Sequence, residues 1–164
     1  MQSTSQRTPS TGARSTPIYQ TTAFVFDDAD HAASLFNLQT FGYIYSRLTN
    51  PTVAVLEERL ANLEGGRGCV CAASGHAAQL LAFFTLMEPG DEFLASRNLY
   101  GGSITQFTHT FKKFGWNATF VDPRDPAAFR AALTPRCKAI FIESLANPGG
   151  VVSDVEAIAR IAEE

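Results

Sequence analysis

The chain has 164 residues, of which 45% are hydrophobic and 11% aromatic, and this is enough apolar material for the core of one domain. Its formal charge of −3 and isoelectric point near 5.6 leave no basic surplus to attract nucleic-acid phosphates or anionic lipids. No apolar segment approaches the roughly 18–20 residues that span a bilayer, and the N-terminal region lacks a signal-type apolar stretch. We therefore expect a soluble, cytoplasmic protein that acts on small molecules.

Residues 1–16 are rich in Ser and Thr, contain Arg7 and Arg14, and include no acidic residue. This composition is typical of a disordered tail. An organellar transit peptide has a similar bias, but the stretch is short and has no amphipathic apolar face. A disordered tail is therefore the favoured interpretation.

A helix is predicted to follow between residues 50 and 66. Asn50 can act as its N-cap, Pro51 suits the first helical position, and Gly65 and Gly66 would end it. Its apolar residues recur at helical spacing, at Val53, Leu56, Leu60 and Leu63. These signals together predict an amphipathic helix.

The rest of the chain alternates between strand-like and helical segments. Strands are predicted at 69–73, 92–96, 118–122 and 138–144, and helices at 76–87, 102–114 and 125–133. A last helix is predicted to begin near Ser153, whose spacing to Glu156 fits a capping box. This alternation predicts an α/β fold with right-handed crossovers and a mainly parallel sheet covered by helices on both faces.

Ser74, Gly75 and His76 lie where a predicted strand leads into a predicted helix. In parallel α/β folds ligands bind at the carboxyl ends of strands, and the free N–H groups of a helix start favour an anion such as phosphate. Ser74 could equally be a simple N-cap, and His76 a residue without a role at the helix start. The glycine-rich dinucleotide fingerprint and the P-loop motif are both absent from the sequence.

The three cysteines do not predict a metal site. Cys69 and Cys71 stand on a predicted buried strand without a second ligand pair, and Cys137 is distant in sequence. Small apolar side chains in a reducing compartment are the better interpretation.

From about Pro17 to its end the chain resembles the Cys/Met-metabolism family of enzymes that use pyridoxal 5′-phosphate. The segments that carry the resemblance are, in order, TPIYQTTAFVFDDADHAASLF, YSRLTNPTVAVLEERLANLEGG, ASGHAAQ, PGDEFLASRNLYGGS and ESLANPGG. The resemblance implies the large domain of the aspartate aminotransferase-like fold (fold type I), incomplete at its C-terminus. It also implies three regions: the tail at 1–16, an N-terminal arm and first helix with inter-subunit contacts at 17–66, and part of the cofactor-binding domain at 67–164.

Within the family, the stretches HAASLFNLQTFGYIYSR, SGHAAQ and NLYGGSITQFTHTFKKFGW are most similar to O-acetylhomoserine sulfhydrylases. The implied reaction replaces the acetate of O-acetyl-L-homoserine by sulfide or a thiol, and with sulfide it gives homocysteine for methionine biosynthesis. The cystathionine γ-synthases, cystathionine γ-lyases and methionine γ-lyases of the same family are the alternatives. A non-catalytic assembly module, which pairs with an intact subunit, is a further alternative.

The resemblance implies that Ser74, Gly75 and His76 form the cup for the cofactor phosphate. Tyr100 is implied to stack on the pyridine ring and is the candidate catalytic residue. From the sequence alone, this tyrosine beside a Gly-Gly pair would be interpreted as a packing residue.

Glu143 and Asn147 are implied to lie beside the cofactor ring, with Asn147 donating toward the phenolic oxygen. Without the resemblance, Glu143 at a predicted strand end could equally be a solvated cap.

Tyr45 and Arg47 are implied to reach the cofactor phosphate of a neighbouring subunit, through a hydroxyl and a charged fork. A surface pair would otherwise be the default interpretation. The resemblance therefore implies a homo-oligomer with shared sites, an obligate dimer usually assembled into a tetramer.

The chemistry of this cofactor requires a lysine that forms a Schiff base and an acid that protonates the pyridine nitrogen. The lysines of the chain are Lys112, Lys113 and Lys138, and none lies in the family's lysine motif. We expect the chain to be the N-terminal part of a longer enzyme and to be inactive by itself.

Overall fold

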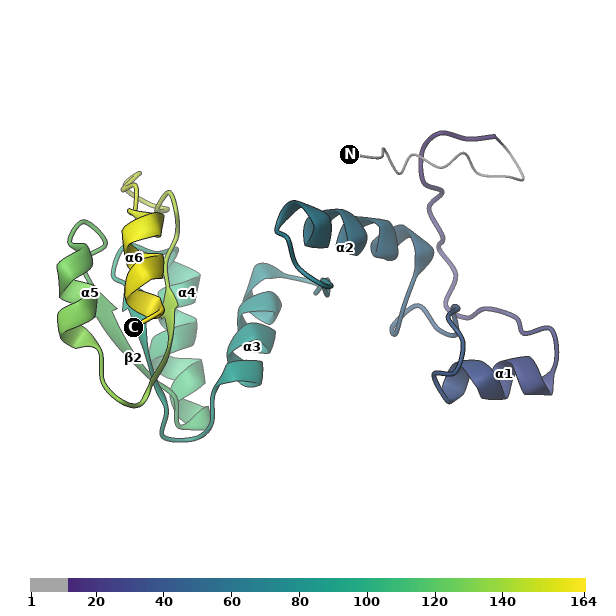
Figure 1. Ribbon diagram of the computed structural model, residues 1–164, viewed down its shortest axis with the longest axis horizontal. Helices are drawn as coiled ribbons and strands as arrows, with labels where there is room; N and C mark the ends of the chain where they lie inside the picture. The colour runs from purple at the N-terminus through teal and green to yellow at the C-terminus, as the bar shows by residue number, and fades with distance from the viewer. Residues whose placement is uncertain (1–11) are drawn as a thin grey trace. The chain divides into compact units, whose positions relative to one another are not determined.

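The computed structural model describes residues 12–164 (Figure 1). The chain divides into two compact units, residues 1–71 and residues 72–164, and each is described by itself. Most of the expected tail at 1–16 lies outside the described residues.

The first unit contains helices α1 (Ala29–Phe36) and α2 (Pro51–Leu63). The start of α2 is as predicted, because the Asn50 side chain accepts a hydrogen bond of 2.9 Å from the Thr52 N–H and Pro51 is the first helical residue. Helix α1 was not predicted, although its N-cap Asp28, which accepts the His31 N–H at 2.7 Å, is visible in the sequence.

Asn50 also fastens the segment that precedes α2. Its side-chain amide donates to the carbonyl of Tyr19 at 2.9 Å and to the hydroxyl of Ser46 at 3.0 Å. The Tyr19 N–H in turn donates to the Thr52 hydroxyl at 2.9 Å. Because the side chain of Asn50 is buried and uses both its donor and its acceptor, it joins two distant segments to the helix start.

The strand predicted at 69–73 does not form. This stretch has no regular secondary structure, Val70 is 77% exposed, and no strand among residues 12–164 pairs with it. A strand needs a neighbour for its backbone groups, and here the Cys71 N–H donates to the Glu57 carboxylate at 2.8 Å instead. Cys69 and Cys71 are half-buried, and burial together with the nearby Glu57 charge raises the pKa of the Cys71 thiol.

The second unit is built on a three-stranded parallel sheet in the order β2-β1-β3. Its strands are β1 (Glu92–Ser96), β2 (Asn117–Val121) and β3 (Cys137–Phe141). The helices are α3 (Gly75–Leu86), α4 (Gly101–Thr105), α5 (Pro126–Ala132) and α6 (Val155–Ala162). The predicted parallel α/β architecture is confirmed.

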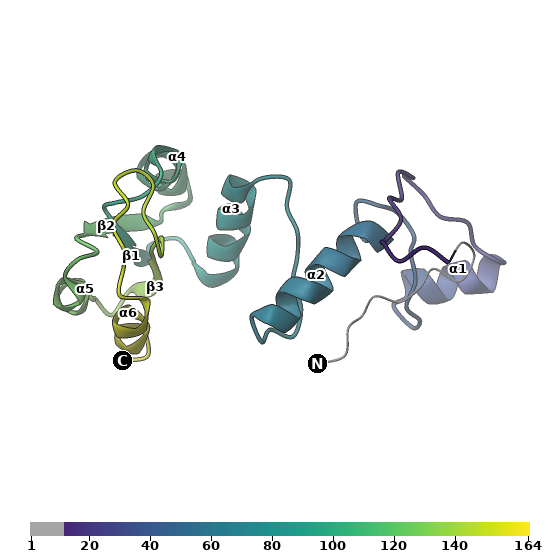
Figure 2. The ribbon, with the colours of Figure 1, turned by 90° about the horizontal axis from the view of Figure 1, so that it is seen from above.

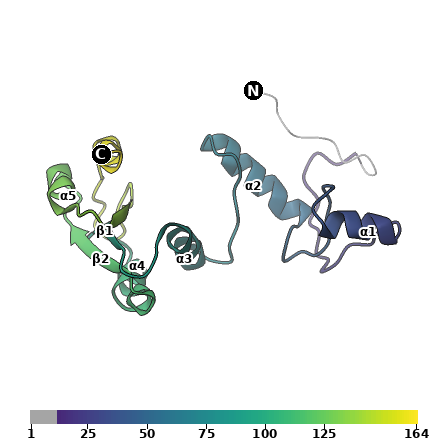
Figure 3. The same cartoon turned by 60° about the horizontal axis from the view of Figure 1, so that its bottom comes forward.

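Successive side chains of β1 point to opposite faces of the sheet and enter two separate cores. Phe93 and Ala95 pack into an aromatic core with Phe83, Phe107, Phe111 and Trp116, whereas Leu94 packs with Val121, Phe129, Ile158 and Ile161. Figures 2 and 3 show α4 on one side of the sheet and α5 and α6 on the other. The sheet is therefore covered on both faces, as predicted.

Two helix predictions require correction. The predicted helix 102–114 is α4 followed by a π-helical turn (Gln106–Thr110) and a 3₁₀ turn (Phe111–Phe114). The cap of α6 is Asp154, whose carboxylate accepts the Ala157 N–H at 2.9 Å, and not Ser153. The Ser153 hydroxyl donates to the backbone carbonyl of Glu143 at 2.8 Å, and this tertiary contact replaces the predicted capping box.

Candidate functional site

Helix α3 begins with a capped first turn that still has free donors. Ser74 is the N-cap, and its hydroxyl accepts the Ala77 N–H at 3.2 Å. Within residues 12–164 the N–H groups of Gly75 and His76 have no hydrogen-bond partner. A Cβ atom added at Gly75 would meet nothing within 4 Å, so the space beside these donors is open. This helix start can receive an anion.

The ring of Tyr100 lies beside the ring of His76. Their centroids are 5.8 Å apart and the planes are inclined by 27°, so the rings are stacked. Tyr100 is the residue before α4, and 52% of it is exposed. The structure therefore places an accessible aromatic face next to the free donors of α3, an arrangement that suits a planar group with an attached anion.

Two side-chain amides connect the start of α3 to α4 and to the turn that follows it. The Gln106 amide donates to the carbonyl of His76, and the Gln79 amide donates to the hydroxyl of Ser103, each at 2.9 Å. Sequence reasoning did not identify these residues, because no local pattern marks a contact between positions 30 residues apart. They fix the position of the helix start relative to Tyr100.

Glu143 follows β3 and connects two loops. One carboxylate oxygen accepts the Tyr100 N–H at 2.9 Å, and the other accepts the Asn147 N–H at 2.8 Å. Residues 145 and 152 form an antiparallel bridge around the loop that contains Asn147, and the Asn147–Pro148 peptide bond is cis. Both carboxylate oxygens of Glu143 therefore accept hydrogen bonds from backbone N–H groups. Asn147 itself is exposed.

Tyr45 and Arg47 belong to the first unit. The structure brings them together, because the Arg47 guanidinium lies over the Tyr45 ring, 4.9 Å from its centroid. The backbone of Tyr45 also forms an antiparallel bridge with Ala23.

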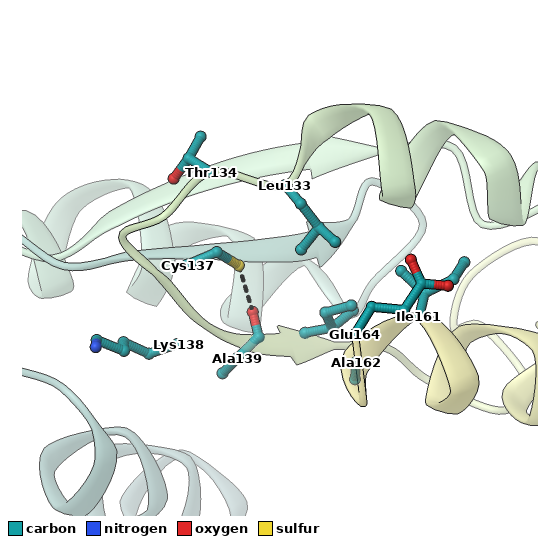
Figure 4. Close-up of a pocket in the computed structure, with 9 residues that line it drawn as sticks. Leu133, Thr134, Cys137, Lys138, Ala139, Ile161, Ala162 and Glu164 are labelled. Atoms are coloured by element: carbon teal, nitrogen blue, oxygen red, sulfur yellow. Dashed lines mark hydrogen bonds between the residues drawn. The ribbon is translucent and has the colours of Figure 1, made fainter.

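A groove of about 350 Å³ lies elsewhere in the second unit, between β3 and α6 (Figure 4). It is lined by Leu133, Thr134, Cys137, Lys138, Ala139, Ile140, Ile161, Ala162 and Glu164. The Cys137 thiol donates to the Ala139 carbonyl at 3.5 Å. None of these lining residues belongs to the cluster around Tyr100, and Glu143 follows the carboxyl end of β3. The groove is therefore separate from the cluster around Tyr100.

Among the described residues, no helix has the length and apolar character that a membrane crossing requires.

The chain matches the family model described as Cys/Met metabolism PLP-dependent enzyme over residues 1–164. It is 47% identical over 156 residues to the O-acetyl-L-homoserine sulfhydrylase of Leptospira meyeri, covering 95% of this chain and 35% of that protein. The chain thus spans about a third of the length of such curated relatives.

Solved structures agree with this match. A Campylobacter jejuni structure that contains N′-pyridoxyl-lysine-5′-monophosphate superposes with a TM-score of 0.84 at 45% identity, covering 93% of this chain and 37% of that one. The cystathionine γ-lyase of Lactobacillus plantarum, solved with L-serine, superposes with a TM-score of 0.81 at 37% identity and covers 96% and 39%. From the family model, the shared fold and these identities, the chain belongs to the Cys/Met-metabolism family of PLP-dependent enzymes.

Proposed function

We propose that the chain forms the N-terminal part of an O-acetylhomoserine sulfhydrylase, which replaces the acetate of O-acetyl-L-homoserine by sulfide. The observation that supports this reaction most directly is the 47% identity to the O-acetyl-L-homoserine sulfhydrylase of Leptospira meyeri. The free α3 donors, the stacked ring of Tyr100 and the loop held by Glu143 support the cofactor site. When bound, pyridoxal 5′-phosphate supplies an electron sink for breaking and forming bonds of the amino-acid substrate.

The phosphate of the cofactor is proposed to bind at the start of α3. The N–H groups of Gly75 and His76 are available, and the partial positive charge of the helix N-terminus favours a dianion there. Because Ser74 already caps the Ala77 N–H, its hydroxyl serves the phosphate by fixing this turn, with its own proton still free to donate.

The ring of the cofactor is proposed to stack on Tyr100, whose exposed face adjoins the phosphate donors. The side chain of Asn147 would donate to the phenolic oxygen of the ring. Glu143 is proposed to act indirectly, by positioning Tyr100 and Asn147, because its two carboxylate oxygens accept hydrogen bonds from the backbone N–H groups of these residues.

Tyr45 and Arg47 are proposed to complete the phosphate site of a neighbouring copy of the chain. The Tyr45 ring holds the Arg47 guanidinium in one orientation. An oriented guanidinium can bind a phosphate through two hydrogen bonds. This part of the proposal makes the protein a homo-oligomer, either a dimer or a tetramer, and we place it in the cytoplasm. Sedimentation of a longer polypeptide that contains the chain tests the assembly state.

The lysine that binds the cofactor is proposed not to be Lys112, Lys113 or Lys138. Lys112 and Lys113 lie on the 3₁₀ turn at the far end of the helical segment that starts after Tyr100. Lys138 lies near the amino end of β3, whereas the candidate site is at the carboxyl ends of the strands. The Schiff base would then require a lysine from outside these 164 residues.

A chimera tests the proposed activity. The chain replaces the matching N-terminal third of the Leptospira meyeri relative, and homocysteine release from O-acetyl-L-homoserine and sulfide is measured. Activity in the chimera, and its loss in a chimera with Tyr100→Ala, is the expected result. A chimera that folds and binds the cofactor but produces no homocysteine would contradict the sulfhydrylase assignment.

A lyase is the second candidate, because the chain is also 37% identical to a cystathionine γ-lyase of known structure. Preferred turnover of cystathionine or methionine by the same chimera would favour it. Stable association of the free chain with the intact relative, without activity, would instead support a non-catalytic assembly role.

A further inference from the structure

Gly102 lies directly against the Tyr100–His76 ring pair. A Cβ atom at this position would be 2.5 Å from Cε1 of Tyr100 and 2.7 Å from both Cε1 and Nε2 of His76. Such distances are shorter than any normal contact of a Cβ atom, so at least one ring would have to move.

The backbones of Tyr100 and His76 are both held in place by hydrogen bonds. The backbone of Tyr100 is held by Glu143, and the backbone of His76 is held by the amide of Gln106. A side chain at position 102 would therefore be accommodated by rotating the Tyr100 or His76 ring, which breaks the stack. The neighbouring Gly101 differs, because a Cβ atom there would meet nothing within 4 Å.

We propose that Gly102 is a positioning residue that sets the stacking distance of Tyr100 and His76 and so makes the Tyr100 face available to a planar, phosphate-bearing ligand. The identity of the ligand rests on the proposed function. The steric effect of a side chain at position 102 rests only on the contacts with the two rings. The adjacent glycine provides a matched control in the same turn of α4.

The steric part is tested without ligand, by NMR of the histidine ring protons in the full 164-residue chain. The Tyr100 ring current shifts the His76 signals, and Gly102→Ala is expected to remove that shift while Gly101→Ala preserves it. His31 and His109, which are not part of the ring pair, report whether each variant is folded. Unchanged His76 signals in folded Gly102→Ala would overturn the inference.

The ligand part is tested in the chimera with the Leptospira meyeri relative, which supplies the rest of the cofactor site, by the dissociation constant of pyridoxal 5′-phosphate from equilibrium dialysis. Gly102→Ala is expected to weaken binding about tenfold, because the displaced Tyr100 ring no longer lies beside the start of α3. Gly101→Ala should bind as the unchanged chain does. Equal affinity of the two variants would refute the positioning role.

A double variant separates a specific clash from a general loss of helix quality. In a Tyr100→Ala background the closest contact of the added methyl group and the ring face that Gly102 is proposed to position are both absent, so Gly102→Ala should cost much less affinity there. An equal loss in both backgrounds would contradict the inference. If the folded chimera with the unchanged chain does not bind the cofactor, the proposed function fails, whereas the His76 signals still decide the steric part.

Discussion

The backbone N–H of Tyr100 donates a hydrogen bond of 2.9 Å to the carboxylate of Glu143, which is 43 residues later in the chain. The same carboxylate holds the N–H of Asn147. One side chain thus fixes two loops at the carboxyl ends of neighbouring parallel strands, β1 and β3. This relationship explains how residues that are distant in sequence can form one site.

Glu143→Gln should loosen this site while keeping its size. One carboxylate oxygen becomes an NH₂ group that cannot accept from a backbone N–H, so one hydrogen bond is lost at a cost of about 1–3 kcal/mol. Amide exchange should accelerate at Tyr100 or Asn147, and cofactor affinity should fall. Glu163→Gln, at the exposed C-cap residue of α6, is the control. Unchanged exchange at both amides would show that the carboxylate does not hold these loops.

Asn50→Ala should destabilise the first unit. The substitution removes the N-cap of α2 and the contacts with Tyr19 and Ser46, at an expected cost of about 1–3 kcal/mol. Hydrogen exchange at the Thr52 and Ala54 amides measures the effect. Asn62→Ala, on the exposed last turn of the same helix, should be neutral or slightly stabilising because alanine has the higher helix propensity. Equal protection in both variants would contradict the capping role.

Glu92 should make the second unit less stable in acid. A hydrogen bond from Thr134 and the nearby Arg136 charge hold the pKa of this carboxyl group below its ordinary value in the folded state. A lowered pKa means that the stabilisation is complete above the ordinary pKa and is lost as the pH falls through the folded-state pKa.

The measurement for Glu92 is the free energy of unfolding between neutral pH and roughly pH 3, across the range where glutamate titrates. Glu92→Gln should lower stability at neutral pH and flatten the acid-dependent part of the profile, whereas Glu163→Gln should retain the profile of the unchanged chain. If the stability of Glu92→Gln falls in acid as steeply as that of the unchanged chain, Glu92 does not contribute to the acid sensitivity.

Asp154→Ala should fray the start of α6, because the carboxylate caps the Ala157 N–H. The expected cost is about 1 kcal/mol, seen as faster exchange of that amide. Ser153→Ala makes the contrasting change, since its hydroxyl contacts the carbonyl of Glu143 and not the helix. It should leave the Ala157 amide protected. The reverse pattern would restore Ser153 as the cap.

Features encoded within a few neighbouring residues were predicted correctly. The start of α2 follows from Asn50 and Pro51, whose capping chemistry acts over two positions. The strand at 92–96 follows from its short apolar run, and Phe93 and Leu94 do enter opposite cores. The family resemblance added the candidate site residues, which composition and periodicity did not distinguish from caps and packing residues.

Features that depend on a distant partner were decided by the tertiary structure. The apolar stretch 69–73 has the composition of a strand, but pairing requires another strand beside it. Ser153 fits a capping box by spacing, yet the nearby carbonyl of Glu143 competes for its hydroxyl. Tertiary contacts override such local preferences because a hydrogen-bonding group can satisfy only a few partners.

The sequence by itself determined the alternation of elements, the parallel α/β class and the glycines beside Tyr100. Only the tertiary structure decided which glycine lies against the rings of Tyr100 and His76, because an added Cβ atom would meet nothing within 4 Å at Gly101 and both rings at Gly102. It likewise decided that the Glu143 carboxylate accepts two backbone hydrogen bonds and is not a solvated cap. The physical reason is that hydrogen bonding and steric exclusion act at contact distance, and contacts between residues far apart in the chain are set by the fold.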